Sequence, residues 1–110
     1  MAHRIEIDQL AGNTQTAAKN APRDDLRGAT VYFNGASDGT MTMQVSPDHG
    51  GNWFTAVDED GNNVTDGGVL AGPFVLAMQA TSYRFSMAGH TAGTSTAWVI
   101  IPDQQPRGSH

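Results

Sequence analysis

Apolar and polar side chains alternate with a period of two along most of this chain, and this pattern predicts a protein built from short β-strands. The clearest examples are the segments 40–45 and 83–87, in which every second residue is Met, Val, Tyr or Phe. Further strands are expected at 4–8, 29–34, 53–57, 69–78 and 95–101, with turn residues such as Gly, Asn, Asp and Pro between them. We therefore expect an all-β fold, an antiparallel β-sandwich of jelly-roll or immunoglobulin-like type.

The same pattern divides the 110 residues into three parts. Residues 29–103 hold most of the alternating segments and are expected to form the sandwich, a single domain. Residues 1–28 begin with a short half-buried strand and then lose the alternation, and Pro22 interrupts any helix there. We expect this part to be an extended N-terminal arm that is either disordered or ordered only on a partner. Residues 104–110 form a polar tail whose ending resembles a protease-site or tag remnant.

The segment from Ser46 to Trp53 joins two expected strands and has the composition of a tight turn. Ser46 and Asp48 can hydrogen-bond to nearby backbone groups, and Gly50 and Gly51 can adopt the positive φ that a sharp reversal requires. Trp53 enters the returning strand and can close over the turn. We expect these residues to stabilise the fold and to have no catalytic role.

The last expected strand, residues 95–101, carries apolar side chains on both faces. Trp98 and Ile100 point one way, whereas Val99 and Ile101 point the other way. Only one face of a strand in a two-layer sandwich meets the core, so the second apolar set must be covered by the arm, by a loop or by another subunit. We favour another subunit, which makes Trp98, Val99, Ile100 and Ile101 candidate interface residues.

Charge and composition narrow the classes of partner. The formal net charge is −5 and the six basic residues are scattered, which argues against nucleic-acid binding. No run approaches the roughly 20 apolar residues of a membrane span, and the N-terminus has no apolar signal core. The absence of cysteine fits a protein that folds in a reducing cytoplasm.

Candidate chemistry is sparse. The four histidines, His3, His49, His90 and His110, do not have metal-ligand spacing. The acidic segment 58–66 lacks the Gly and Glu positions of an EF-hand, so a type I′ turn at Asp60-Gly61 is expected there, with weak calcium binding left open. No nucleophile has an identifiable base beside it. We expect neither an enzyme nor a cofactor.

Ser46, Asp48, Gly50 and Trp53 match the Ser-x-Asp-x-Gly-x-x-Trp pattern of the Asp-box hairpin, with Asn52 where Thr is more usual. The Asp box occurs repeatedly in sialidase propellers and singly in other β proteins, including small phage structural proteins. The resemblance implies a hairpin-stabilising turn away from any catalytic centre. One copy in 110 residues is too little for a propeller.

Together with the acidic, cysteine-free sandwich and the arm, the segment from Met43 to Trp53 resembles capsid decoration (cement) proteins of tailed bacteriophages. The resemblance implies a non-enzymatic virion protein, made in the host cytoplasm, that binds the major capsid protein on the outer capsid surface, commonly as a trimer, and bridges capsid subunits. The basic residues of the arm are then candidates for docking on the capsid: Arg4, Lys19, Arg23 and Arg27. A carbohydrate-binding module, using Tyr32 or Trp98, and a tail or fibre accessory protein are the alternatives.

Overall fold

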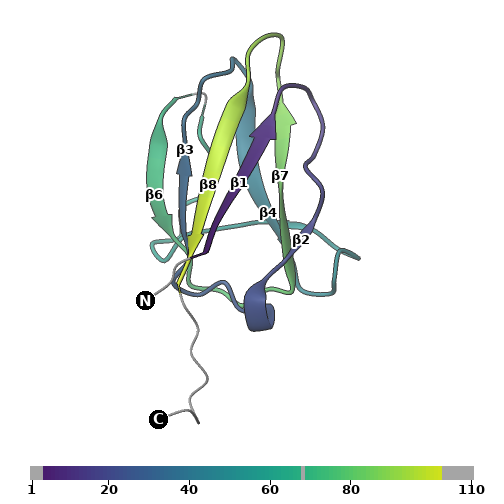
Figure 1. The fold of residues 1–110 in the computed structure, drawn as a ribbon, viewed down its shortest axis with the longest axis vertical. Coiled ribbons are helices and arrows are strands. Elements are labelled where there is room, and N and C mark those ends of the chain that lie inside the picture. Colours follow the sequence, from purple (N-terminus) through teal and green to yellow (C-terminus); the bar gives the residue numbers. More distant parts are fainter. Residues whose placement is uncertain (1–3, 68, 103–110) are drawn as a thin grey trace.

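A computed structural model describes residues 4–67 and 69–102, which form two four-stranded antiparallel sheets packed as two layers (Figure 1). The first sheet has the order β1-β8-β3-β6, formed by β1 (Arg4–Leu10), β8 (Ser95–Ile101), β3 (Thr30–Phe33) and β6 (Ala71–Val75). The second has the order β2-β7-β4-β5, formed by β2 (Lys19–Asn20), β7 (Ser82–Ala88), β4 (Thr40–Ser46) and β5 (Phe54–Thr55). A short 3₁₀ helix, η1 (Pro22–Asp24), follows β2. The expected antiparallel β-sandwich is confirmed.

The order of the strands distinguishes between the two expected types of sandwich. The first strand pairs with the eighth, the second with the seventh, the third with the sixth and the fourth with the fifth. The chain therefore follows the path of one long hairpin, in which the first four strands pair with the last four and the whole is rolled into two sheets. This nested pairing is the jelly-roll arrangement of eight strands.

The core lies between the two sheets and is formed by the side chains that point inward from each strand. The ring of Phe33 on β3 packs edge-on against Phe74 and Phe85, with ring centroids 5.9 and 5.8 Å apart. Other buried side chains come from alternate positions of the long strands: Met41, Met43 and Val45 on β4, Tyr83 and Met87 on β7, and Ala97, Val99 and Ile101 on β8. Alternation predicted the core-facing side of β4 and β7 correctly, whereas β8 is apolar on both sides and its core-facing side was left open.

Residues 4–28 belong to the sandwich, which corrects the expected boundary at residue 29. β1 pairs with β8 along its whole length, and the chain then continues, extended, along β7. There Thr16 N–H donates to the Phe85 carbonyl at 2.8 Å, and Met87 N–H donates to the Thr14 carbonyl at 3.0 Å. The segment is extended, as expected, but backbone hydrogen bonds hold it in place, and these leave no trace in the side-chain pattern. The polar tail at 104–110 lies outside the described residues.

The acidic turn at 58–62 also differs from the expected type I′ turn. Gly61 has a φ of +85°, but Asp60 does not share the positive φ that a type I′ turn requires at both central positions. The Asp58 carboxylate instead accepts the N–H groups of Asp60 and Asn62, at 2.9 and 2.8 Å. This carboxylate therefore stabilises the backbone of its own turn.

Candidate functional site

Two rows of side chains cross the outer face of the β1-β8-β3-β6 sheet. Ile7, Trp98 and Tyr32 lie directly opposite one another on β1, β8 and β3, and Ile5 lies opposite Ile100 in the neighbouring row. Directly opposed side chains on one face of a sheet pack against each other. We call the surface formed by these five residues and Leu70 the apolar face.

The orientation of β1 places two isoleucines on the apolar face. Ile5 and Ile7 point outward and are 59% and 55% exposed, while Glu6 and Asp8 point inward. The inward carboxylates are compensated by Lys19, whose Nζ lies 3.3 Å from Glu6 Oε1 and 3.2 Å from Asp8 Oδ1. The half-buried strand expected at residues 4–8 is therefore present, with its polar side toward the interior.

These charges shift the pKa values of neighbouring groups. The side-chain hydrogen bond from Arg4 and the proximity of Lys19 lower the pKa of the Glu6 carboxyl. Burial raises the pKa of the Tyr83 hydroxyl, and the negative charges of Glu6 and Asp8 raise it further. Tyr83 is therefore neutral, and Lys19 supplies the positive charge at this edge of the sandwich.

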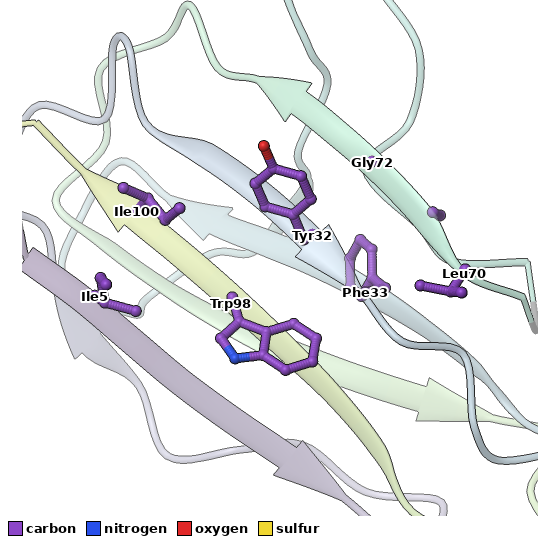
Figure 2. Close-up of a pocket in the computed structure, with 8 residues that line it drawn as sticks. Ile5, Tyr32, Phe33, Leu70, Gly72, Trp98 and Ile100 are labelled. Atoms are coloured by element: carbon purple, nitrogen blue, oxygen red, sulfur yellow. The ribbon is translucent and has the colours of Figure 1, made fainter.

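A hollow of about 380 Å³ lies in the apolar face (Figure 2). Trp98, Tyr32, Ile5, Ile100 and Leu70 are among its lining residues, and Leu70 is 81% exposed. Gly72 on β6 also lines it, and a Cβ at this position would lie 2.8 Å from the Val31 carbonyl oxygen. Any larger residue there would disturb the backbone of β3 beside the hollow.

The outer face of the other sheet is polar. Thr40, Thr42 and Gln44 on β4 and Ser86 on β7 occupy outward positions, and Arg84 Nε donates to Gln44 Oε1 at 2.7 Å. A sandwich normally presents polar residues on both outer faces. The apolar side chains on the first sheet are therefore an exception, and such patches commonly mark interaction sites.

The four candidate interface residues on β8 separate into two pairs. Trp98 and Ile100 share one side of the strand, as their alternation predicted, and the structure places that side on the apolar face. Val99 and Ile101 are buried between the sheets, with 0% and 2% exposure, and so are unavailable to a partner. This corrects their assignment to the interface, because one side of β8 must fill the core.

The Asp-box residues form a hydrogen-bonded turn between β4 and β5. The buried Ser46 Oγ accepts the N–H groups of Asp48 and Gly50, at 3.2 and 2.8 Å, and donates to Asp48 Oδ1 at 2.9 Å. Asp48 in turn accepts the backbone and side-chain N–H groups of Asn52, at 2.8 and 2.6 Å. These bonds, led by the Asn52 side chain, lower the pKa of Asp48. The polar side chains of the turn therefore form their hydrogen bonds within the turn itself, as expected for a structural role.

Two glycines are needed in this turn. Gly50 has a φ of +96°, and a Cβ on it would lie 3.6 Å from the ring of Trp53. Gly51 does not have the positive φ expected of it, which His49 adopts instead at +58°. A Cβ on Gly51 would still lie 2.9 Å from Asp48 Oδ2. The Arg84 guanidinium lies over the Trp53 ring, with its central carbon 4.2 Å from the ring centroid.

The four candidate docking residues lie in the N-terminal segment, and three of them have carboxylate partners within the chain. Arg4 Nε bonds to Glu6 at 2.7 Å, Arg27 contacts both oxygens of Asp25 at 3.0 Å, and Lys19 lies between Glu6 and Asp8. Arg23 is exposed and lines a second hollow, of about 330 Å³, together with Asp24 and Gln79. These residues therefore do not project as an uncompensated basic arm.

Metal-binding clusters and membrane-spanning helices are not found in the part of the chain that the structure describes. Within residues 4–67 and 69–102, three or more His, Cys, Asp or Glu side chains do not gather into a metal-binding group. Over the same residues, no helix has the length and apolarity needed to cross a bilayer. The apolar face is therefore the candidate functional site, because exposed apolar patches commonly mark interaction sites.

Sequence reasoning identified the β8 part of this face and missed Ile5, Ile7 and Leu70. The Ile-Glu-Ile-Asp alternation of β1 by itself favours an inward isoleucine side, and the structure reverses this, with Glu6 and Asp8 turned toward Lys19. Comparison with protein-family models, with curated proteins and with solved structures found no significant match to this chain.

Proposed function

We propose that this chain is a non-enzymatic structural protein of a tailed-bacteriophage virion. In this proposal it binds the major capsid protein on the outer capsid surface as a homo-oligomer, and it stabilises the shell by bridging capsid subunits. The apolar face carries the proposal, because a contiguous apolar surface on a small protein suits a contact with another protein. Jelly rolls occur in both viral capsid proteins and lectins, so the choice rests on the site and on the resemblance of the Asp-box segment.

The N-terminal segment supplies a second surface for the shell, on which Arg4 and Arg27 are each also paired with a carboxylate of the chain. Arg4 is paired with Ile101 at the end of β8, and a Cβ on Gly28 would lie 3.5 Å from Pro102. Arg4 and Arg27 therefore come from the same end of the sandwich, where η1 with Arg23 also lies (Figure 1). We propose that this end faces the capsid and contacts acidic groups on the shell subunits.

Carbohydrate binding is the second candidate function, because Trp98 and Tyr32 border the hollow in the apolar face (Figure 2). Aromatic rings stack on sugars, but a sugar also needs several polar partners for its hydroxyl groups. The side chains around this hollow offer few polar atoms, chiefly the Tyr32 hydroxyl and the Trp98 indole N–H. This lining favours a protein contact over a sugar.

Co-sedimentation with empty shells tests the proposal, using shells assembled from the major capsid protein encoded in the same genome. We expect saturable binding and a higher thermal disruption temperature of the decorated shells. Arg23→Glu combined with Arg27→Glu should weaken binding at least about 10-fold, because it replaces attraction with repulsion. Arg84→Gln, on the polar face of the other sheet, is the matched control. Failure of the wild-type protein to sediment with shells, or selective binding to a glycan array, would contradict the proposal.

A further inference from the structure

We infer that the apolar face is covered by a second copy of this chain, with the two copies facing each other across a two-fold axis. This inference concerns the purified protein and does not depend on capsid binding. It rests on the composition of the molecular surface, on the shape of the apolar face and on its size.

The composition of the surface indicates which part of a second copy can provide the cover. A cover for apolar side chains has to be apolar itself, or it would leave polar groups buried without partners. The large exposed apolar side chains of the described residues are Ile5, Ile7, Tyr32, Leu70, the adjoining Val69, and Phe54 and Val57 near β5. Most of them belong to, or adjoin, the apolar face itself. A second copy therefore offers the same face as its best cover.

Contact between identical faces sets the symmetry. An interface in which both copies use the same patch is isologous, and it generates a two-fold axis and a closed dimer. A trimer would need two different complementary patches on each copy. Phe54 and Val57 are too few to form the second patch. The surface therefore favours a dimer over the trimer implied by the resemblance to decoration proteins.

The shape of the face suits this arrangement. The outer side of the β1-β8-β3-β6 sheet presents a hollow beside Trp98 and Tyr32, and the highly exposed Leu70 stands at its edge (Figure 2). In a two-fold pair, Leu70 of each copy faces the hollow of the other copy. Two sheets packed in this way lie about 10 Å apart, as in a sandwich core.

The size of the face sets the strength of the association. Taking roughly 150 to 200 Å² for a fully exposed large side chain, the exposed fractions of Ile5, Ile7, Tyr32 and Leu70, with the partly exposed Trp98 and Ile100, give on the order of 500 Å² per copy. Two copies would then bury on the order of 1,000 Å², the lower limit for a specific interface. We therefore expect a reversible dimer with micromolar affinity.

Sedimentation velocity and light scattering over about 5 to 500 µM protein test this proposal. The wild-type chain should pass from one to two copies per particle as its concentration rises. The association should persist in about 1 M NaCl, because salt screens charges but does not weaken apolar contacts. A single-chain mass at the highest concentration, or a trimer, would overturn the proposal.

Two variants locate the interface. Ile7→Lys and Leu70→Lys should each raise the dissociation constant at least about 100-fold, because the two-fold axis places each buried lysine in the interface twice. Phe54→Lys is the matched control, because Phe54 is 57% exposed, close to the 55% of Ile7, but lies on the other sheet. Thermal unfolding shows whether each variant is folded. Leu70 lies outside the strands, so Leu70→Lys still tests the interface if Ile7→Lys does not fold. Equal dissociation by Phe54→Lys, or unchanged dimers in both lysine variants, would contradict the assignment.

Discussion

Lys19 Nζ lies 3.2 Å from Asp8 Oδ1, and this ion pair joins the two sheets at the open edge of the sandwich. Lys19 belongs to β2 in one sheet, and Asp8 belongs to β1 in the other. The pair explains how β1 can turn its carboxylates inward and leave its isoleucines on the apolar face. An electrostatic contact at one edge thus shapes the outer surface of the sheet.

The first prediction concerns this ion pair. Lys19→Met should lower the free energy of unfolding by about 1.5 to 3 kcal/mol, because Asp8 is buried and would lose its charged partner. Chemical denaturation measures the change. Arg4→Met is the control, because Arg4 and Glu6 form an exposed pair that should contribute about 0 to 1 kcal/mol. Equal effects of the two substitutions would show that Lys19 does not have this role.

The second prediction concerns acid stability. The hydroxyl and N–H groups of Thr91, followed by the N–H of Ala92, hold the pKa of Asp38 far below its usual range. A group whose pKa is lowered by folding contributes stability that is complete above about pH 4 and is lost as the pH falls below that value. Asp38→Asn should therefore reduce the melting temperature at pH 7 and flatten its decline in acid. Thr91→Val should have a smaller effect in the same direction, and an unchanged acid profile in both variants would disprove the assignment.

The third prediction concerns the Asp-box turn. Ser46→Ala should cost about 1 to 3 kcal/mol, because the buried Oγ accepts two backbone N–H groups that would lose their partner. Asp48→Ala should also destabilise the protein, because it removes the acceptor for Asn52. The exposed Thr55→Ala, on β5, is the control. Denaturant midpoints for the turn variants that match the wild type would refute a stabilising role.

The fourth prediction concerns the N-terminal segment. Deletion of residues 1–28 should prevent folding, since it removes the partner strand of β8 and the buried side chains of Leu10, Ala21 and Leu26. Burial of a leucine side chain alone contributes about 1.5 to 3 kcal/mol, and a small domain is only marginally stable. Circular dichroism of the truncated chain gives the result. A cooperative melt with native β-sheet signal would show that the sandwich folds without this segment.

The sequence by itself determined the fold class and most of the core. Strict alternation on β4 and β7 admits one inward face on each strand, because the opposite face is polar, whereas β8 is apolar on both faces and its inward side could not be assigned from the pattern. The Asp-box turn was also readable, because its Ser, Asp and Gly residues act on backbone groups within a few positions of themselves. Local chemistry of this kind depends on neighbours in the chain and needs no tertiary information.

The tertiary structure decided the jelly-roll order, the role of residues 4–28 and the composition of the apolar face. The strand order depends on pairings between positions up to the whole chain apart, such as Arg4 with Ile101, which a periodic pattern cannot specify. The inward side of β1 depends on Lys19, which compensates Glu6 and Asp8 only because another sheet brings it there. The apolar side of a half-buried strand normally meets the core, and on β1 this partner across the fold allows the charged side to be buried instead.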